Sequence, residues 1–91
     1  YHIDYPARWA DSGQAIAENE WALARAIRRG ETSIAEEIEI EARDGRRKTI
    51  LNYALPIRDA EGATAGGVSV NVDISSRREA ERALQRRLAE L

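Results

Sequence analysis

The feature that most constrains the fold is a strand pattern that passes directly into a helix pattern near the C-terminus. Every second residue over Val68–Ile74 is apolar, with polar residues between them, which is typical of a strand with one dry and one wet face. The segment from Ser75 to the last residue contains neither Gly nor Pro and many strong helix formers, which predicts a helix over 75–91. Because no flexible segment separates the two patterns, the strand is predicted to continue rigidly into the helix.

Three further elements precede this pair. The pattern over 19–29 is helical, with Asn19 as the expected N-cap and Gly30 as the expected left-handed stop. Residues 34–42 alternate between apolar residues and glutamates, which predicts a strand whose dry face includes Ile34. Asp44-Gly45 predicts a hairpin turn, and the apolar run that follows predicts a strand over 48–58 with cover on both faces.

The predicted fold class is therefore α+β. It comprises one helix, a three-stranded antiparallel meander and a C-terminal helix. The predicted segments are an irregular N-terminal stretch over 1–18, the helix and sheet over 19–74, and a linker helix over 75–91.

The length of the hairpin loop sets the register of the first strand pair. A two-residue loop places Glu41 opposite Lys48 and Ile38 opposite Leu51, whereas a three-residue loop shifts this pairing by one residue. The Asp44-Gly45 dipeptide favours the two-residue loop.

The C-terminal helix carries both a start signal and an apolar stripe. Ser76 and Glu79 fit a capping box. Leu84, Leu88 and Leu91 are spaced four and three residues apart, which is typical of a coiled-coil seam; the alternative is that the helix packs this stripe on its own domain. An isolated helix of this length is marginal in water, so either arrangement requires a partner surface.

Composition narrows the function classes. The chain is 43% hydrophobic and 33% charged without a long apolar run, which indicates a soluble domain that makes no membrane contact. A formal net charge of −2 argues against nucleic-acid binding. The lack of cysteine excludes disulfides and thiolate zinc sites and suits the cytoplasm. The single histidine, His2, has Asp4 nearby but no third ligand, so no metal site is predicted.

Several segments together carry a family resemblance. They are the helix end "ARAIRRGE", the strands "EEIEIEARDGRR" and "ILNYALPIRDAEG", and the junction "GGVSVNVDISSRREAERAL", approached through "RWADSGQAIAENEW". In this order, over about residues 9–85, the chain resembles the C-terminal half of a PAS domain with its outgoing signalling helix. The last two segments are similar to the PAS-associated motif of bacterial sensor proteins, with Ser75 where Thr is commoner.

The resemblance implies an incomplete sheet. A complete PAS fold has five antiparallel strands in the spatial order 2-1-5-4-3, and this chain lacks counterparts of the first two strands. The strand over 68–74 would then lose a neighbour, and unpaired apolar edges recruit other chains. We expect a homo-oligomer, a dimer, formed through the sheet edge, the sheet face or the C-terminal helix. The start at Tyr1 rather than Met suggests a piece of a longer polypeptide.

The resemblance also implies roles for particular residues. In the family the Asp of the junction motif pairs with a nearby Arg and sets the angle of the exit helix, which suggests that Asp73 pairs with Arg77 or Arg78, beside Ser75. Trp21 and Tyr53, with Trp9, are candidate pocket-lining residues, although core packing is the commoner fate of aromatic side chains. No cofactor is predicted, because the helix over 19–30 lacks the histidine of haem-binding PAS domains and the chain lacks the cysteine of photoactive flavin PAS domains.

The function implied is that of a sensory and dimerising PAS module without catalysis of its own. It would transmit a signal to an effector domain in cis, a sensor histidine kinase or alternatively a diguanylate cyclase, encoded after Leu91. The rival interpretation is a protein-interaction or assembly domain that senses no ligand.

Overall fold

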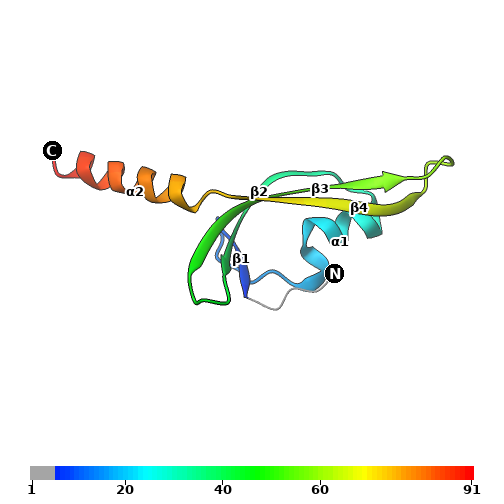
Figure 1. The fold of residues 1–91 in the computed structure, drawn as a ribbon, viewed down its shortest axis with the longest axis horizontal. Helices are drawn as coiled ribbons and strands as arrows, with labels where there is room; N and C mark the ends of the chain where they lie inside the picture. The colour runs from blue at the N-terminus through cyan, green and yellow to red at the C-terminus, as the bar shows by residue number, and fades with distance from the viewer. Residues whose placement is uncertain (1–5) are drawn as a thin grey trace.

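The computed structural model describes residues 6–91. The elements are β1 (Ala7–Trp9), a 3₁₀ turn η1 (Glu18–Glu20), α1 (Ala22–Arg29), β2 (Ser33–Glu41), β3 (Arg47–Arg58), β4 (Thr64–Asp73) and α2 (Ser75–Ala89). The strands form one antiparallel sheet in the order β1-β2-β3-β4 (Figure 1). The predicted α+β class and antiparallel sheet are confirmed, but the sheet has four strands rather than three.

The additional strand, β1, lies in the segment that was predicted to be irregular. Ala7 pairs with Ile40 and Trp9 with Ile38, so β1 adds to the outer edge of β2. Gly13, at φ 74°, helps to turn the chain back, and Ile16 N–H donates to Ala7 O at 3.0 Å. A strand of three residues is too short to display a period of two, which is why the sequence pattern did not reveal it.

Helix α1 begins later than predicted and ends where predicted. Asn19 is not its N-cap, because residues 18–20 form the 3₁₀ turn and α1 starts after Trp21. Gly30 adopts φ 70° and donates its N–H to Ala26 O at 3.0 Å, which confirms the left-handed stop.

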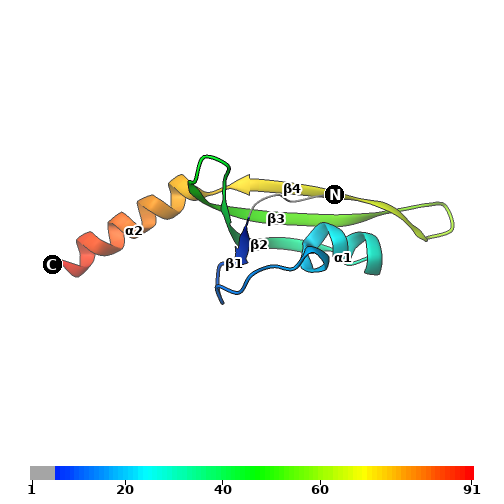
Figure 2. The same ribbon diagram turned by 90° about the horizontal axis from the view of Figure 1, so that it is seen from below.

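The core lies between α1 and one face of the sheet. Trp21, Ile38 and Ile50 form its main cluster, with Trp9 and Ile16 packed against it. Ala22 and Ala26 of α1 meet Ala54 of β3 in a second cluster, where the small side chains allow a close approach of helix and sheet. Figure 2 shows α1 against one side of the sheet.

A bulge in β2 reverses its alternation. The register shifts between Ser33 and Glu36, and Ala35 takes a positive φ of 53°. Ser33 is consequently buried and Ile34 is 75% exposed, so the prediction that Ile34 lies on the dry face is wrong. Ile38, beyond the bulge, is fully buried as expected.

The hairpin register follows the longer loop. Glu41 pairs with Arg47 and Ile38 with Ile50, shifted by one residue from the favoured prediction. Ala42 N–H donates to Arg46 O at 2.8 Å, which closes a three-residue loop in which Gly45 has φ 81°. This is the three-residue hairpin with a left-handed residue at its third position.

The sheet face opposite α1 is open. Ile50, Asn52 and Ala54 of β3 are buried on the α1 side, but Leu55 and Ile57 are about half exposed on the other side. The prediction that β3 is covered on both faces is therefore wrong. Val68, Val70 and Val72 of β4 share one face, as predicted, but that face is the open one, since Val68 pairs with Leu55 and Val72 with Leu51. The prediction that the apolar face of this strand is the dry one is therefore wrong.

The molecule is elongated because α2 projects from one end of the sheet (Figure 1). Its principal extents are 60 × 24 × 20 Å and its Cα radius of gyration is 16.0 Å. No residue of α2 is buried. Neither helix of the described residues has the length and hydropathy needed to cross a lipid bilayer.

Candidate functional site

The candidate site is the junction at which β4 becomes α2. Asp73 is the last residue of β4, Ser75 is the first of α2, and Ile74 between them is the helix N-cap. Ile74 is buried, and its N–H donates to Thr49 O of β3 at 2.8 Å. Arg78 N–H then donates to Ile74 O at 3.0 Å and starts the helical hydrogen bonding. The strand thus passes into the helix through one anchored residue.

Asp73 and Ser75 fasten this turn. Ser75 N–H donates to Asp73 Oδ1 at 2.9 Å, and Thr49 N–H donates to Ser75 Oγ at 2.9 Å. Hydrogen bonding from the Ser75 hydroxyl, followed by that from Ser75 N–H, holds the pKa of Asp73 below its ordinary value. The Asp73 carboxylate satisfies a free N–H at the start of the helix, where negative charge is favoured.

Arg78 ties the first turn of α2 to the sheet. Its guanidinium donates to Glu37 of β2 and, at 2.6 Å, to Glu81 of α2. Arg78 and Glu37 are each about one-third exposed. The Glu37 hydrogen bond, followed by that to Glu81, raises the pKa of Arg78 above its ordinary value, and Arg78 lowers the pKa of Glu81.

The predicted pairing within the junction is therefore wrong. Asp73 caps the helix through Ser75, whereas Arg78 reaches Glu37 and Arg77 bonds to Glu81 at 3.3 Å. The predicted capping box at Ser76 is also wrong, because α2 starts at Ser75, two residues before the start that an N-cap at Ser76 requires, and its actual N-cap, Ile74, supplies no side-chain cap. The structure brings Asp73, Ser75 and Arg78 together, but with different partners.

Glu37 and Thr49 were not predicted to belong to the junction. Glu37 lies 41 residues before Arg78, on a strand face that the alternation predicted only to be wet. A period-two pattern identifies which residues face water but not which distant helix comes to lie over them. The sequence does carry one signal for Glu37. The glutamates of β2 outnumber the basic residues near them, so a carboxylate remains to pair with a cation from elsewhere in the fold.

A polar hollow separates α2 from the β2–β3 hairpin. It has a volume of about 150 Å³, and it is lined by acidic, basic and hydroxyl side chains: Glu39, Arg47, Lys48, Thr49, Ser75, Glu79 and Arg82. The contact between helix and sheet is therefore made by charged side chains rather than by a dry core. Such contacts fix orientation while contributing little to stability.

The leucines of α2 are unpartnered among the described residues. Leu84 and Leu88 are each 59% exposed and Leu91 is fully exposed. The alternative that α2 packs its stripe on its own domain is not the arrangement observed. Both interpretations required a partner surface, and that requirement remains.

The two candidate pocket residues lie on opposite sides of the sheet. Trp21 is buried in the core beside α1, with Trp9 packed against the same cluster. Tyr53 lies on the open face, where it helps to line a shallow apolar hollow of about 230 Å³ with Ile34 and Leu55. The structure therefore does not combine these residues into one pocket.

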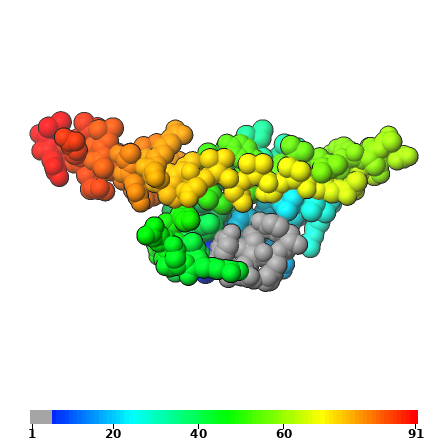
Figure 3. All heavy atoms as spheres, viewed as in Figure 1, coloured from blue at the N-terminus to red at the C-terminus, as the bar shows by residue number. Residues whose placement is uncertain are grey.

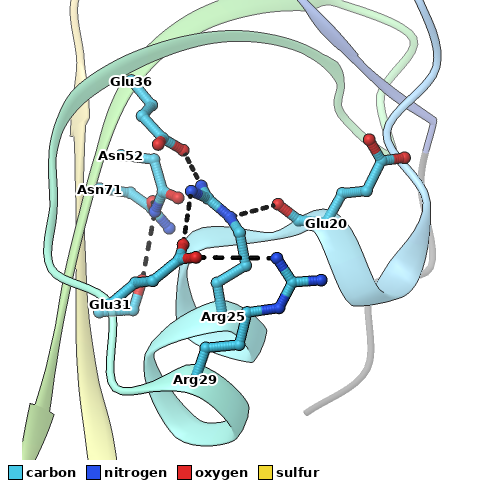
Figure 4. Close-up of polar contacts among 8 residues, drawn as sticks. Glu20, Arg25, Arg29, Glu31, Glu36, Asn52 and Asn71 are labelled. Carbon is cyan, nitrogen blue, oxygen red and sulfur yellow. Dashed lines mark hydrogen bonds and ion pairs between the residues drawn. The ribbon is translucent and has the colours of Figure 1, made fainter.

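A second polar cluster surrounds Arg25 on the α1 side (Figure 4). Arg25 bonds to Glu20 O at 3.0 Å, to Glu31 at 3.2 Å and to Glu36 of β2. Burial alone would lower the pKa of Arg25, but the hydrogen bond to Glu36 and the charge of that carboxylate contribute to a net rise. The cluster anchors α1 to the strand segment beside the β2 bulge.

One buried amide, that of Asn52, lies beside this cluster (Figure 4). Asn52, which is 1% exposed, donates to Asn71 Oδ1 at 2.6 Å and to Ser69 Oγ at 3.2 Å (Figure 4). Its own Oδ1 lacks a hydrogen-bond partner in the structure. These bonds tie β3 to β4 on the covered face.

Within residues 6–91, no three or more His, Cys, Asp or Glu side chains are grouped closely enough to hold a metal ion. His2 and Asp4 lie outside the described residues. The absence of a cofactor stays a prediction.

Comparison of the chain with protein-family models, with curated proteins and with solved structures finds no match.

Proposed function

We propose that the chain is a signal-transmitting and dimerising module of the PAS type that carries no catalysis of its own. Its effector in cis would be a histidine kinase, or alternatively a diguanylate cyclase, in a cytoplasmic bacterial signalling protein. The module would need no cofactor and would bind neither nucleic acid nor membrane. The main support is the continuity of β4 and α2 at Ile74, without a flexible linker.

The junction suits transmission because the start of α2 is hydrogen-bonded to the sheet, while the rest of the helix is held only weakly. Ile74 and Ser75 are hydrogen-bonded to Thr49 of β3, so a shift of the sheet must move the start of the helix. Beyond this point α2 is held through Arg78 and Glu37, and its remaining turns contribute nothing to the core. A ligand or partner that displaces the sheet can therefore change the rotation or pairing of the helix.

A phase experiment tests the proposal. The chain would be fused to the catalytic core of a dimeric histidine kinase so that α2 continues in helical register after Leu91, and autophosphorylation would be measured. Inserting two alanines after Ala83 rotates the following helix by about 200°, whereas inserting seven residues restores the phase to within about 20°. We expect the two-residue insertion to change the rate strongly and the seven-residue insertion to restore it.

The open apolar sheet face favours a second candidate, an assembly domain that senses nothing. This function needs only association, so the rotational phase of α2 would not matter. A fused kinase whose rate is the same with both insertions would support the assembly domain and contradict the signalling module.

A further inference from the structure

The open face of the sheet is an extended apolar surface. Six large apolar side chains on it are between 43% and 75% exposed: Ile34, Leu55, Ile57, Val68, Val70 and Val72. We refer to these six residues as the apolar band. In Figure 3 the β4 part of the molecule, in yellow, runs uncovered between α2 and the β3–β4 turn.

The area of the apolar band is large for so small a chain. Together the six residues expose on the order of 500 Å², in the upper part of the range for the largest patch on a typical monomer, where such patches are often functional. Two copies that covered each other's bands would bury roughly 1,000 Å², which is the lower limit for a specific protein interface. A second copy of this chain therefore supplies the area that a dimer needs.

The chemistry of the open sheet face also fits a second copy of this chain as its partner. All six members of the apolar band are uncharged, and the hollow beside Tyr53 is lined almost entirely by apolar surface. Charged side chains meet the apolar band at one end: Glu37, in the same cross-strand row as Val72, bonds to Arg78, and the charges of the polar hollow lie beyond it. An apolar surface with charges confined to its rim is the anatomy of an interface between proteins.

We infer that two copies of the chain pack face to face through the apolar band, as two sheets about 10 Å apart, with Val70 and Tyr53 near the centre. This deepens the dimerising part of the proposed function by naming the partner and the surface. The competing route, pairing of two β4 edges, would leave both bands exposed in a sheet of twice the width. It would therefore not remove the apolar area from water.

A pair of substitutions on one strand separates the two routes. Val70 and Asn71 are neighbours on the same edge strand, but Val70 belongs to the open face and Asn71 lies on the α1 face, where it contacts Asn52. Val70→Lys places a charge inside the proposed interface, and Asn71→Lys places the same charge at the same edge but outside it. Sedimentation velocity would measure the mass of each, with circular dichroism as the check on folding.

We expect wild type and Asn71→Lys to sediment as dimers at tens of micromolar, and Val70→Lys to have a dissociation constant at least tenfold higher. A monomeric wild type would overturn the inference. Equal loss of the dimer in both variants, with the circular dichroism spectrum of each unchanged from the wild type, would also overturn it, because it would indicate edge pairing.

Methyl NMR of the unmodified chain supplies a test that does not depend on the folding of a variant. A soluble paramagnetic probe should broaden the methyl signals of Leu84 and Leu88 on α2 and spare those of Val68, Val70 and Leu55. Equal broadening of both sets at the concentration where the dimer forms would contradict the face-to-face arrangement. Neither readout depends on signalling, so a failed phase experiment and a failed dimer remain distinguishable.

Discussion

At the scale of single residues, Arg78 is the side chain that bonds α2 to β2. It bonds to Glu37 of β2 as well as to Glu81 in its own helix. We expect Arg78→Ala to leave the sheet folded but to speed amide hydrogen exchange over the first turn of α2, because the tie to β2 is lost. Hydrogen–deuterium exchange of peptides that span 74–84 measures this.

Arg77→Ala is the matched control for Arg78→Ala. Arg77 is 72% exposed and its ion pair is with Glu81 on the same helix, so its loss leaves the contact with β2 intact. Equal exchange rates in the two variants would show that the Glu37 contact does not restrain the helix.

The titration of Asp73 reports on the cap of α2. Its folded-state pKa is lowered from 3.8, mainly by the Ser75 hydroxyl, so its stabilising effect is complete above pH 3.8 and disappears as the pH falls through the folded value. We expect Ser75→Ala to move the pKa of Asp73 upward, toward 3.8, in an NMR titration of its carboxyl carbon. An unchanged pKa in the variant would mean that the hydroxyl does not bond to the carboxylate.

At the scale of elements, the features that depend only on short stretches of sequence were predicted correctly. Gly30 as the stop of α1, the strand over 48–58 and the direct passage from β4 into α2 depend on neighbouring residues only, and the structure has all three. Ala35 shows what such patterns miss. Its positive φ produces the β2 bulge, yet alanine carries no sequence signal for this conformation, so the alternation before the bulge was assigned to the wrong face.

The candidate site was predictable only in part, for a related reason. The sequence located the junction because strand and helix patterns abut there. It did not identify the partner of Arg78, since the choice between Asp73 and Glu37 depends on how α2 lies relative to β2. That geometry is set by long-range packing rather than by local spacing.

The contact between α1 and β4 depends on the absence of a side chain at Gly67. A Cβ there would lie 3.0 Å from Leu23 Cδ1 and 3.1 Å from Ile27 Cγ1. We expect Gly67→Val to push α1 away from the sheet and to lower the free energy of unfolding by about 1–3 kcal/mol, the usual cost of overpacking. Urea unfolding followed by tryptophan fluorescence measures this.

Gly66→Val controls for the effect of valine in β4. A Cβ at Gly66 meets nothing within 4 Å, and valine favours strands. The free energy of unfolding of this variant should therefore equal or exceed that of the wild type. If both variants lost the same stability, the α1 contact would not be the cause.

At the scale of the whole molecule, the fold of the sheet and α1 is independent of the leucine stripe on α2. Leu84 and Leu88 touch no core, so replacing both with serine should change the free energy of unfolding of the dilute chain by no more than about 0.5 kcal/mol. Ile38→Ala, in the main core cluster, should cost about 2–5 kcal/mol. A large loss from the double serine variant would mean that α2 packs on the sheet after all.

The projection of α2 has a mechanical consequence. From Ile74 to Leu91 the terminal segment reaches about 25 Å, at 1.5 Å per helical residue. In the proposed signalling module it would act as a lever arm with its fulcrum at Ile74, where a tilt of roughly 5° moves Leu91 by roughly 2 Å. A displacement of the sheet too small to disturb its own hydrogen bonds is thereby amplified at the tip.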